Sequence, residues 1–348
     1  MKCFYAPETE THDPIFRLTY GKIQRNAEQA ERAKLLLAGL DALSLSVTEP
    51  GRAPIAALET VHTKRFLKFL ETAWDEWQKQ PDAGPEVVPN VFPRAATSSY
   101  PHTILAQAGW HMGDTSAPIG QYSWQAALRA ADCAIAATDA VLAGDDKAYA
   151  LCRPAGHHTS AEIAAGHCLL NNAAIAAARL RTAHDRVAIF DIDVHHGNGT
   201  QDIFYDRNDV LSVSIHADPT DYYPFFTGFA YETGSGDGEG YNLNLPLPRT
   251  TKDAAWLAAI DTALDRIATF NPGALVLSLG LDTHEDDPLL GMKVSWDGLR
   301  RAGEKIAAAG YPTVIVQEGG YLTPSLTMSL TSFLSGYLGA KIPALERN

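Results

Sequence analysis

Short apolar runs alternate along the chain with longer stretches in which apolar residues recur every three to four positions. That longer spacing is typical of one face of a helix. Helices are predicted at 22–40, 57–77, 124–144, 171–181, 254–270 and 298–310. The short apolar runs predict strands at 148–152, 187–190, 210–215, 274–279 and 313–317. Strands separated by helical crossovers indicate a parallel sheet with helices on both faces.

The alternation runs on without a recognisable linker, which favours one domain over two. A chain of 348 residues with 46% apolar content can bury a large core. We therefore expect a single α/β domain over 1–348, with a central, mostly parallel sheet. The segment 79–122 contains six prolines and no clear long helix, so we expect a long loop insertion there.

Charge and cysteine usage narrow the expected partners and location. The chain carries 41 acidic and 28 basic residues, a net charge of −13, which argues against nucleic acid or an anionic membrane as partner and permits a cationic substrate. An apolar leader and a run of about 18 apolar residues are both missing, so we expect a cytoplasmic protein. The four cysteines lack CxxC spacing and are expected to be reduced thiols.

Polar residues follow all five predicted strands, and four of the five stretches contain glycine. In chain order these stretches read RPAGHH, DIDVHHGNG, HAD, GLDTHEDDP and EGGY. In open α/β sheets, ligands bind beyond the carboxyl ends of the strands. The five stretches are therefore expected to meet at one site.

The second and fourth of these stretches supply candidate metal ligands. Asp191, Asp193 and His195 occupy alternate positions and share a face if the strand geometry continues. An Asp-rich turn that caps the next helix would explain an isolated Asp-x-Asp, so a further ligand is needed from elsewhere. Asp282 is the best candidate, because it follows its own strand in the same way. Asp193, His195 and Asp282 would leave one coordination position open, as in catalytic zinc sites, and Fe²⁺ or Co²⁺ suits the same donors.

A second polar group next to Asp282 does not require a metal. His284, Asp286 and Asp287 lie in THEDDP, and a polar turn ended by proline accounts for them.

Two adjacent imidazoles are candidates for proton transfer. His157 and His158 follow Gly156, and imidazole can exchange protons near neutral pH. Asp191 can accept a hydrogen bond from one imidazole, and Asn198 can orient the other.

The last polar stretch offers a hydroxyl for the oxygen of a polarised carbonyl. In Glu318-Gly319-Gly320-Tyr321, two glycines let the backbone bring the phenol close to the site. On its own, this motif is explained equally well by a turn followed by a packed aromatic residue.

Taken together, the motifs resemble a known enzyme family. They are RPAGHH, GHCLLNNAAIAA, DIDVHHGNGTQDIFY, SVSIHAD, LSLGLDTHEDDP and EGGY. Their order over about 120–325 resembles the histone-deacetylase-like amidohydrolases of the arginase/deacetylase fold, and the acetylpolyamine amidohydrolases in particular.

The resemblance implies a zinc-dependent deacetylase with a defined division of roles. It implies Asp193, His195 and Asp282 as ligands, His158 as general base and acid, His157 as an electrostatic partner paired with Asp191, and Tyr321 as the polarising hydroxyl. It also implies a K⁺ ion near Asp191 and Ser214, bound in addition by the backbone oxygens of Asp193, His195 and Ile215.

Substrate selection is expected to involve the 79–122 insertion. Phe92, Tyr100, Trp110 and Tyr122 favour docking of this segment over disorder, because exposed aromatic residues favour burial. In the similar acetylpolyamine hydrolases such a segment forms a dimer interface and narrows the entrance. The resemblance therefore implies a homodimer that admits short acetylated diamines, such as acetylputrescine or acetylcadaverine, and excludes folded proteins.

The chain departs from the family pattern at the expected entrance. Acidic positions of the relatives fall at Leu105 and Ser116, which leaves Asp114 as the nearest acid for a distal ammonium group. One aromatic wall position falls at His167. Phe225 and Phe226 are candidates for the other wall, and Gly156 is a further substrate-contacting candidate.

Three alternative functions stay open. A lysine or protein deacetylase would share the chemistry. An arginase-like ureohydrolase would require a two-metal carboxylate cluster, whereas the chain has Asp282-x-His284 where Asp-x-Asp would be expected. A non-catalytic protein that binds acetylated amines would be expected to lack His158 or Tyr321.

Overall fold

Eight parallel strands form the central sheet of the computed structural model, which describes residues 1–93 and 98–341. The strand order is β4-β1-β5-β10-β9-β6-β7-β8, and every neighbouring pair is parallel. The strands are β1 (Lys2–Phe4), β4 (Val47–Thr48), β5 (Lys147–Ala150), β6 (Val187–Asp191), β7 (Val210–Ala217), β8 (Asn242–Leu247), β9 (Ala274–Leu279) and β10 (Thr313–Gln317).

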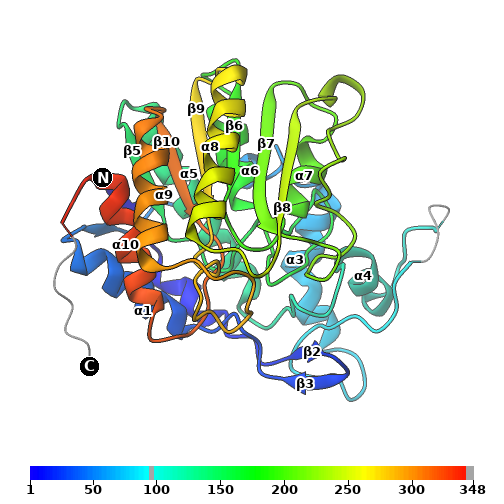
Figure 1. The fold of residues 1–348 in the computed structure, drawn as a ribbon. Coiled ribbons are helices and arrows are strands. Elements are labelled where there is room, and N and C mark those ends of the chain that lie inside the picture. The colour runs from blue at the N-terminus through cyan, green and yellow to red at the C-terminus, as the bar shows by residue number, and fades with distance from the viewer. Residues whose placement is uncertain (94–97, 342–348) are drawn as a thin grey trace.

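Helices cover both faces of this sheet, so the protein is a single three-layer α/β domain (Figure 1). The core on one face includes residues of α3 (Lys64–Trp77), α4 (Ile104–His111), α5 (Ser123–Leu142), α6 (Asn172–Leu180) and α7 (Asn198–Phe204), of which α5, α6 and α7 contact the strands. The other face packs against α1 (Glu31–Ala42), α8 (Asp253–Phe270), α9 (Trp296–Ala308) and α10 (Leu326–Leu338).

The alternation of side chains along the strands creates two separate cores. In β6, Val187 and Ile189 enter the core on the α5 and α6 side, whereas Ala188 and Phe190 enter the core on the α8 side. Successive strand residues point to opposite faces, and a strand buried on both faces is therefore apolar throughout. This explains why the short apolar runs predicted the central strands.

The predicted strands and most predicted helices are confirmed, but the helix predicted at 22–40 is wrong in its first part. Arg17–Thr19 and Lys22–Gln24 form an antiparallel hairpin, β2 and β3, and α1 begins only at Glu31. The turn between the two strands has positive φ at Tyr20 and Gly21. A tight hairpin turn of this hand requires such angles, and glycine supplies one of them without strain.

The helix predicted at 57–77 is divided in two. A short helix, α2 (Ile55–Leu58), ends before Thr63, and the Thr63 side chain accepts a hydrogen bond from the Phe66 N–H at the start of α3. Threonine is a favourable N-cap, so the chain starts a new helix at this residue. The sequence pattern also missed β1, β4, β8 and α10.

Part of the 79–122 insertion packs onto the body of the domain. Val87 and Ile119 form an isolated bridge, and Met112 forms another with Ala164. These three insertion residues are fully or almost fully buried. In Figure 1, α4 lies beside α3, and the cyan chain that leads away from it extends outward from the body. Its residues 94–97 lie outside the described part.

Within the described residues, no helix combines the length and apolar character needed to cross a membrane.

Candidate metal centre and active site

The carboxyl ends of four neighbouring strands bring the predicted site residues together. β10 and β9 lie between β5 and β6 in the sheet, although β5 and β6 come first in the chain. The loops that follow these four strands are therefore adjacent at one edge, as expected for a parallel sheet. They supply the imidazole pair from β5, the DIDVHH stretch from β6, Asp282 from β9 and Tyr321 from β10.

Asp193, His195 and Asp282 form a compact buried cluster. His195 Nδ1 lies 3.0 Å from Asp193 Oδ1 and 3.2 Å from Asp282 Oδ2. One donor atom from each residue lies within 4.8 Å of the other two. Both carboxylates are fully buried and His195 is 6% exposed. The cluster predicted from the sequence is therefore assembled.

The charges in this cluster fit a cation. Asp282 Oδ2 is buried and has no hydrogen-bond partner among the described residues. Burial and the neighbouring charge of Asp193 both raise the pKa of Asp282. Burial opposes protonation of His195, yet its hydrogen bond to Asp193 and the close carboxylate of Asp282 raise the pKa of this imidazole to about 9. An environment that favours positive charge on His195 also favours a metal ion between the same atoms.

Backbone groups hold the two carboxylates in this orientation. Gly319 N–H donates to Asp193 Oδ2 at 2.8 Å, and Val194 N–H donates to Asp282 Oδ1 at 3.1 Å. A Cβ at Gly319 would collide with both carboxylates. Glycine is required there because the backbone approaches the cluster directly.

A second group of possible ligands fits a metal less well. His157, Cys168 and Glu318 also lie close together. Glu318 Oε2 already accepts hydrogen bonds from the backbone N–H groups of Gly156 and His157. Burial raises the pKa of Cys168 well above its usual value and raises that of Glu318 to about 7. A protonated thiol is a poor metal ligand, so this group serves better as an anchor for the histidine loop.

The two adjacent imidazoles have different partners and opposite pKa shifts. His157 Nδ1 lies 2.9 Å from Asp191 Oδ2, and His158 Nδ1 lies 2.7 Å from Asn198 Oδ1. Burial acts to lower the pKa of His157, but the carboxylates of Asp191 and Asp193 raise it to about 10. Burial and then the charge of His157 lower the pKa of His158 well below its usual value. A neutral His158 is thus available to accept a proton.

Tyr321 is held at the site by residues that the sequence analysis did not single out for this purpose. Asp287 Oδ2 accepts the Tyr321 N–H at 2.9 Å, so Asp287 is more than part of a polar turn. Arg32 is buried, donates to the carbonyl groups of Glu318 and Gly320, and lies over the Tyr321 ring at 5.0 Å. The Tyr321 hydroxyl lies 3.1 Å from His167 Nδ1.

The wall beside His158 is formed by Tyr223, which the sequence analysis missed. Its ring lies edge-on to His158, with centroids 4.9 Å apart, and its hydroxyl donates to Asp114 Oδ2 at 2.6 Å. Phe225 and Phe226, the residues predicted for this wall, are 48% and 88% exposed. The run of aromatic residues in YYPFF was a signal, but sequence alone could not show which ring turns inward.

Asp114 is tied into the same wall. Its Oδ2 also accepts the Gly166 N–H at 3.2 Å, and its Oδ1 accepts the Ser116 N–H at 2.7 Å. Gly166 in turn touches the His158 ring, and a Cβ there would collide with it. Leu105, the other position at which relatives carry an acid, is 45% exposed on α4.

The residues implied for potassium binding are neighbours across the sheet. Asp191 pairs with Ser214 in the register of β6 and β7. Ser214 Oγ lies 2.8 Å from His216 Nδ1, and Asp191 Oδ1 accepts the Asp193 N–H at 3.0 Å.

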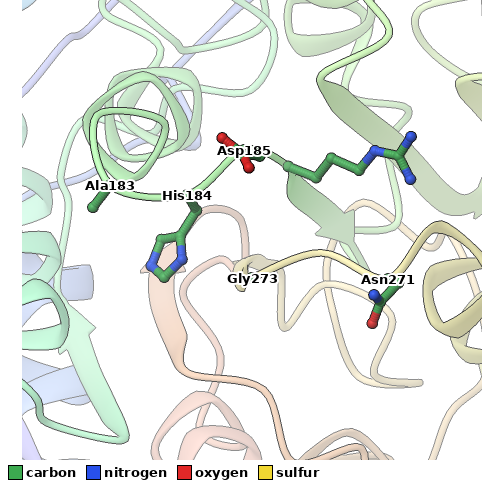
Figure 2. A pocket seen from close by; sticks show the side chains of 6 residues that line it. Ala183, His184, Asp185, Asn271 and Gly273 are labelled. Atoms are coloured by element: carbon green, nitrogen blue, oxygen red, sulfur yellow. The ribbon is translucent and has the colours of Figure 1, made fainter.

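A separate surface hollow lies at the amino ends of β6 and β9, at the opposite end of the sheet from the site (Figure 2). Its residues precede β6 and β9 rather than follow them, and they include His184 and Arg186. None of the predicted site residues lines this hollow.

Comparison with known proteins identifies the family. A model of the histone deacetylase domain matches residues 26–337. The chain belongs to the histone deacetylase family. This assignment agrees with the parallel sheet and with the polar loops at its carboxyl edge. It also makes the protein a hydrolytic deacetylase, and members of this family are typically metal-dependent.

Several members of the histone deacetylase family resemble the chain over nearly its full length. An acetylpolyamine amidohydrolase from Burkholderia pseudomallei is 46% identical, with 97% of this chain and 98% of the relative covered. Acetylpolyamine amidohydrolase 1 from Pseudomonas aeruginosa is 40% identical, with 98% and 99% covered. A crystal structure of the Burkholderia pseudomallei acetylpolyamine aminohydrolase superposes with a TM-score of 0.94 over 97% of this chain and 98% of that one. The HDA15 deacetylase domain, 26% identical, gives 0.80 over 99% of this chain and 90% of that one.

The choice between the two possible ligand groups can be tested by calorimetric titration of metal-free protein with Zn²⁺. We expect Asp282→Asn to weaken binding by at least about 10- to 100-fold, the range already reached when residues around a ligand are changed. Cys168→Ser should leave the affinity within about threefold, because its thiol stays protonated. A strong loss of Zn²⁺ affinity in Cys168→Ser, together with normal affinity in Asp282→Asn, would instead place the metal between His157, Cys168 and Glu318.

Proposed function

We propose that the protein removes acetyl groups from short acetylated polyamines, such as acetylputrescine or acetylcadaverine, and releases acetate and the free amine. The observation that carries this proposal is the Asp193, His195 and Asp282 cluster beside His158, whose ring centroid lies 5.8 Å from that of His195. The substrate class is supported by the full-length relatives, which are acetylpolyamine amidohydrolases. The net charge of −13 is compatible with a cationic amine.

Asp193, His195 and Asp282 are proposed to bind one Zn²⁺ per subunit, although Fe²⁺ or Co²⁺ suits the same donors. A metal bound in this position would act as a Lewis acid, which polarises the acetamide carbonyl and lowers the pKa of a water molecule. The donor set has one imidazole and two carboxylates, and a buried oxygen of Asp282 has no hydrogen-bond partner in the part of the chain that the structure describes. This is the chemistry of a site that keeps a position open for reactants.

The proton transfers are assigned to the imidazole pair. His158, kept neutral by burial and by the neighbouring positive charge, takes a proton from the attacking water. It later returns this proton to the departing amine. His157 stays protonated through its contact with Asp191 and does not exchange the proton itself. Asn198 fixes the orientation of His158 through Nδ1, which leaves Nε2 for the reaction.

Tyr321 is proposed to donate its hydroxyl hydrogen to the carbonyl oxygen as that oxygen gains negative charge. Its backbone is fixed by Asp287 and its ring by Arg32, so the loop is held before substrate arrives. The alternative of a binding protein without catalysis is disfavoured because both His158 and Tyr321 are present.

A structural K⁺ ion is proposed near Asp191 and Ser214, with backbone oxygens of Asp193, His195 and Ile215. The adjacency of Asp191 and Ser214 across β6 and β7 supports this assignment. The ion would lie beneath the loop that carries two of the proposed zinc ligands.

A homodimer formed through the 79–122 insertion is proposed to narrow the entrance. Apolar side chains exposed in and near this segment support an interface, because large exposed apolar patches mark contact surfaces. They are Leu18, Tyr20, Ile23, Val91, Phe92, Leu105, Tyr122 and Phe226, with exposures from 43% to 98%. A protein lysine deacetylase would need a wider entrance, and an arginase-like ureohydrolase would need a second metal.

The catalytic assignments predict severe losses of turnover. His158→Ala and Tyr321→Phe should each lower kcat on acetylputrescine by about 10²-fold or more, because each removes a group that acts in the transition state. His184→Ala, at the opposite end of the sheet, is the control and should be unaffected. Near-normal turnover of either metal-loaded variant would remove that residue from its role.

Substrate selection predicts that acetylputrescine and acetylcadaverine are hydrolysed in preference to acetyllysine peptides. Asp114→Asn should raise KM for the diamines by at most about fivefold with little change in kcat, since a half-exposed ion pair contributes only about 0.2 to 1 kcal/mol. Asp237→Asn, at an exposed position in the 3-10 turn Gly236–Gly238, is the matched control.

Two further outcomes separate the possible causes. Tyr223→Phe removes the hydroxyl that Asp114 binds but keeps the carboxylate. If this variant reproduces the rise in KM, then Asp114 acts through the wall and not on the ammonium group. Equal cleavage of acetyllysine peptides by a protein that sediments as a dimer would contradict the narrowed entrance.

A further inference from the structure

His167 stands in an unusual position for a wall residue. It is 7% exposed, and its backbone has φ of 70°, a left-handed conformation that few residues other than glycine adopt. Such strained positions persist where the surroundings enforce them, and they are concentrated at functional sites. The strain here directs an imidazole toward Tyr321, with the rings edge-on and their centroids 5.5 Å apart.

The polar contacts of His167 differ from those of the two catalytic imidazoles. The partners of His157 and His158 at Nδ1 are oxygens that can only accept, so Nδ1 carries the proton in both rings. The partner of His167 Nδ1 is the Tyr321 hydroxyl at 3.1 Å, which can donate or accept. His167 Nε2 is buried and has no partner among the described residues. The proton of His167 is therefore free to reside on either nitrogen.

The position of this proton decides whether Tyr321 can assist the reaction. A phenol has one O–H, and within the described part of the chain His167 Nδ1 is its one hydrogen-bond partner. If Nδ1 accepts that O–H, the hydrogen is withheld from the substrate. If Nδ1 carries the proton, it donates to the phenol oxygen, and the O–H is left for another acceptor. Donation to the oxygen also makes the phenol a stronger donor, because hydrogen bonds in a chain polarise one another.

We propose that His167 is a positioning residue for the Tyr321 hydroxyl. With its proton on Nδ1, it donates to the phenol oxygen and turns the phenol O–H toward the substrate's carbonyl oxygen as that oxygen gains negative charge. Burial lowers the pKa of His167 well below its usual value, so the imidazole is neutral and both tautomers carry one proton. This inference rests on the proposed deacetylase function. It gives His167 a role in that reaction that an aromatic side chain at the same position could not fill.

The test is a double-mutant cycle on acetylputrescine hydrolysis with metal-loaded enzymes. His167→Phe keeps a ring but removes the bond. We expect kcat to fall about tenfold with KM within about twofold, because the hydrogen bond that supports the Tyr321 hydroxyl in the transition state is lost. In the Tyr321→Phe background, the same change should have no further effect, because the hydroxyl on which His167 acts is absent. His167→Asn should recover kcat to within about threefold, since its amide offers a donor near the place of Nδ1 and asparagine tolerates positive φ.

Control variants keep the result interpretable. His184→Phe makes the same chemical change at the hollow of Figure 2 and should leave kcat unchanged. If His167→Phe does not fold, His167→Gly relieves the left-handed backbone and must show the same loss, again only when Tyr321 is intact. An unchanged or increased kcat in the Tyr321 enzyme, or an equal loss in both backgrounds, overturns the inference. Failure of the wild-type enzyme to hydrolyse acetylputrescine would instead reject the proposed substrate, independently of His167.

Discussion

Two carboxylates buried side by side impose the main physical constraint on this protein. Asp193 and Asp282 are fully buried, and burial together with the neighbouring charge of Asp193 raises the pKa of Asp282. Burial of unpaired charge is costly, so the arrangement requires positive charge or protons between the two groups. His195 lies between them, and the backbone N–H groups of Gly319 and Val194 bind the outer oxygens. A divalent cation is the species that satisfies the remaining donors best.

The surrounding loops follow from this constraint. Gly319 must be glycine so that the β10 loop can reach the carboxylates, and this places Tyr321 two residues later at the same site. Glu318, one residue earlier, binds the backbone of the imidazole loop. One short segment therefore couples the proposed metal ligands, the proposed base and the proposed polarising hydroxyl. Two further side chains hold this segment in place. Arg32 donates to the carbonyl groups of Glu318 and Gly320, and Asp287 accepts the Tyr321 N–H.

Much of the fold could be predicted because the central strands are buried on both faces. VAIF is apolar throughout and ALVLSL is interrupted only by Ser278, and each run is followed by polar residues that the sheet topology brings to the same end of the sheet. The edge strands β4 and β8 were missed because neither gives a continuous apolar run. β4 has only 2 residues, and β8 is only partly buried. The hairpin of β2 and β3 was missed because its residues also fit a helical pattern, and the turn at Tyr20 and Gly21 decides the outcome.

Within the site, the grouping of the candidate ligands and imidazoles was predictable and the supporting contacts were not. Asp193 and Asp282 can be recognised from the short motifs in which they lie, DIDVHH and GLDTHEDDP. Tyr223 binds Asp114 across 109 positions, and Arg32 binds Glu318 across 286, so no local pattern reveals either contact. The wall was predicted at Phe225 and Phe226, but only the folded chain shows that Tyr223 is the ring that packs against His158.

The central claim is that Asp193, His195 and Asp282 hold a catalytic metal. It is tested most directly by removing metal with a chelator, confirming its absence by elemental analysis, and following acetylputrescine hydrolysis during titration with Zn²⁺. The account predicts no activity without metal and a linear rise that reaches its plateau at about one Zn²⁺ per subunit. Full activity in verified metal-free protein, or a plateau only at two metals per subunit, would contradict it.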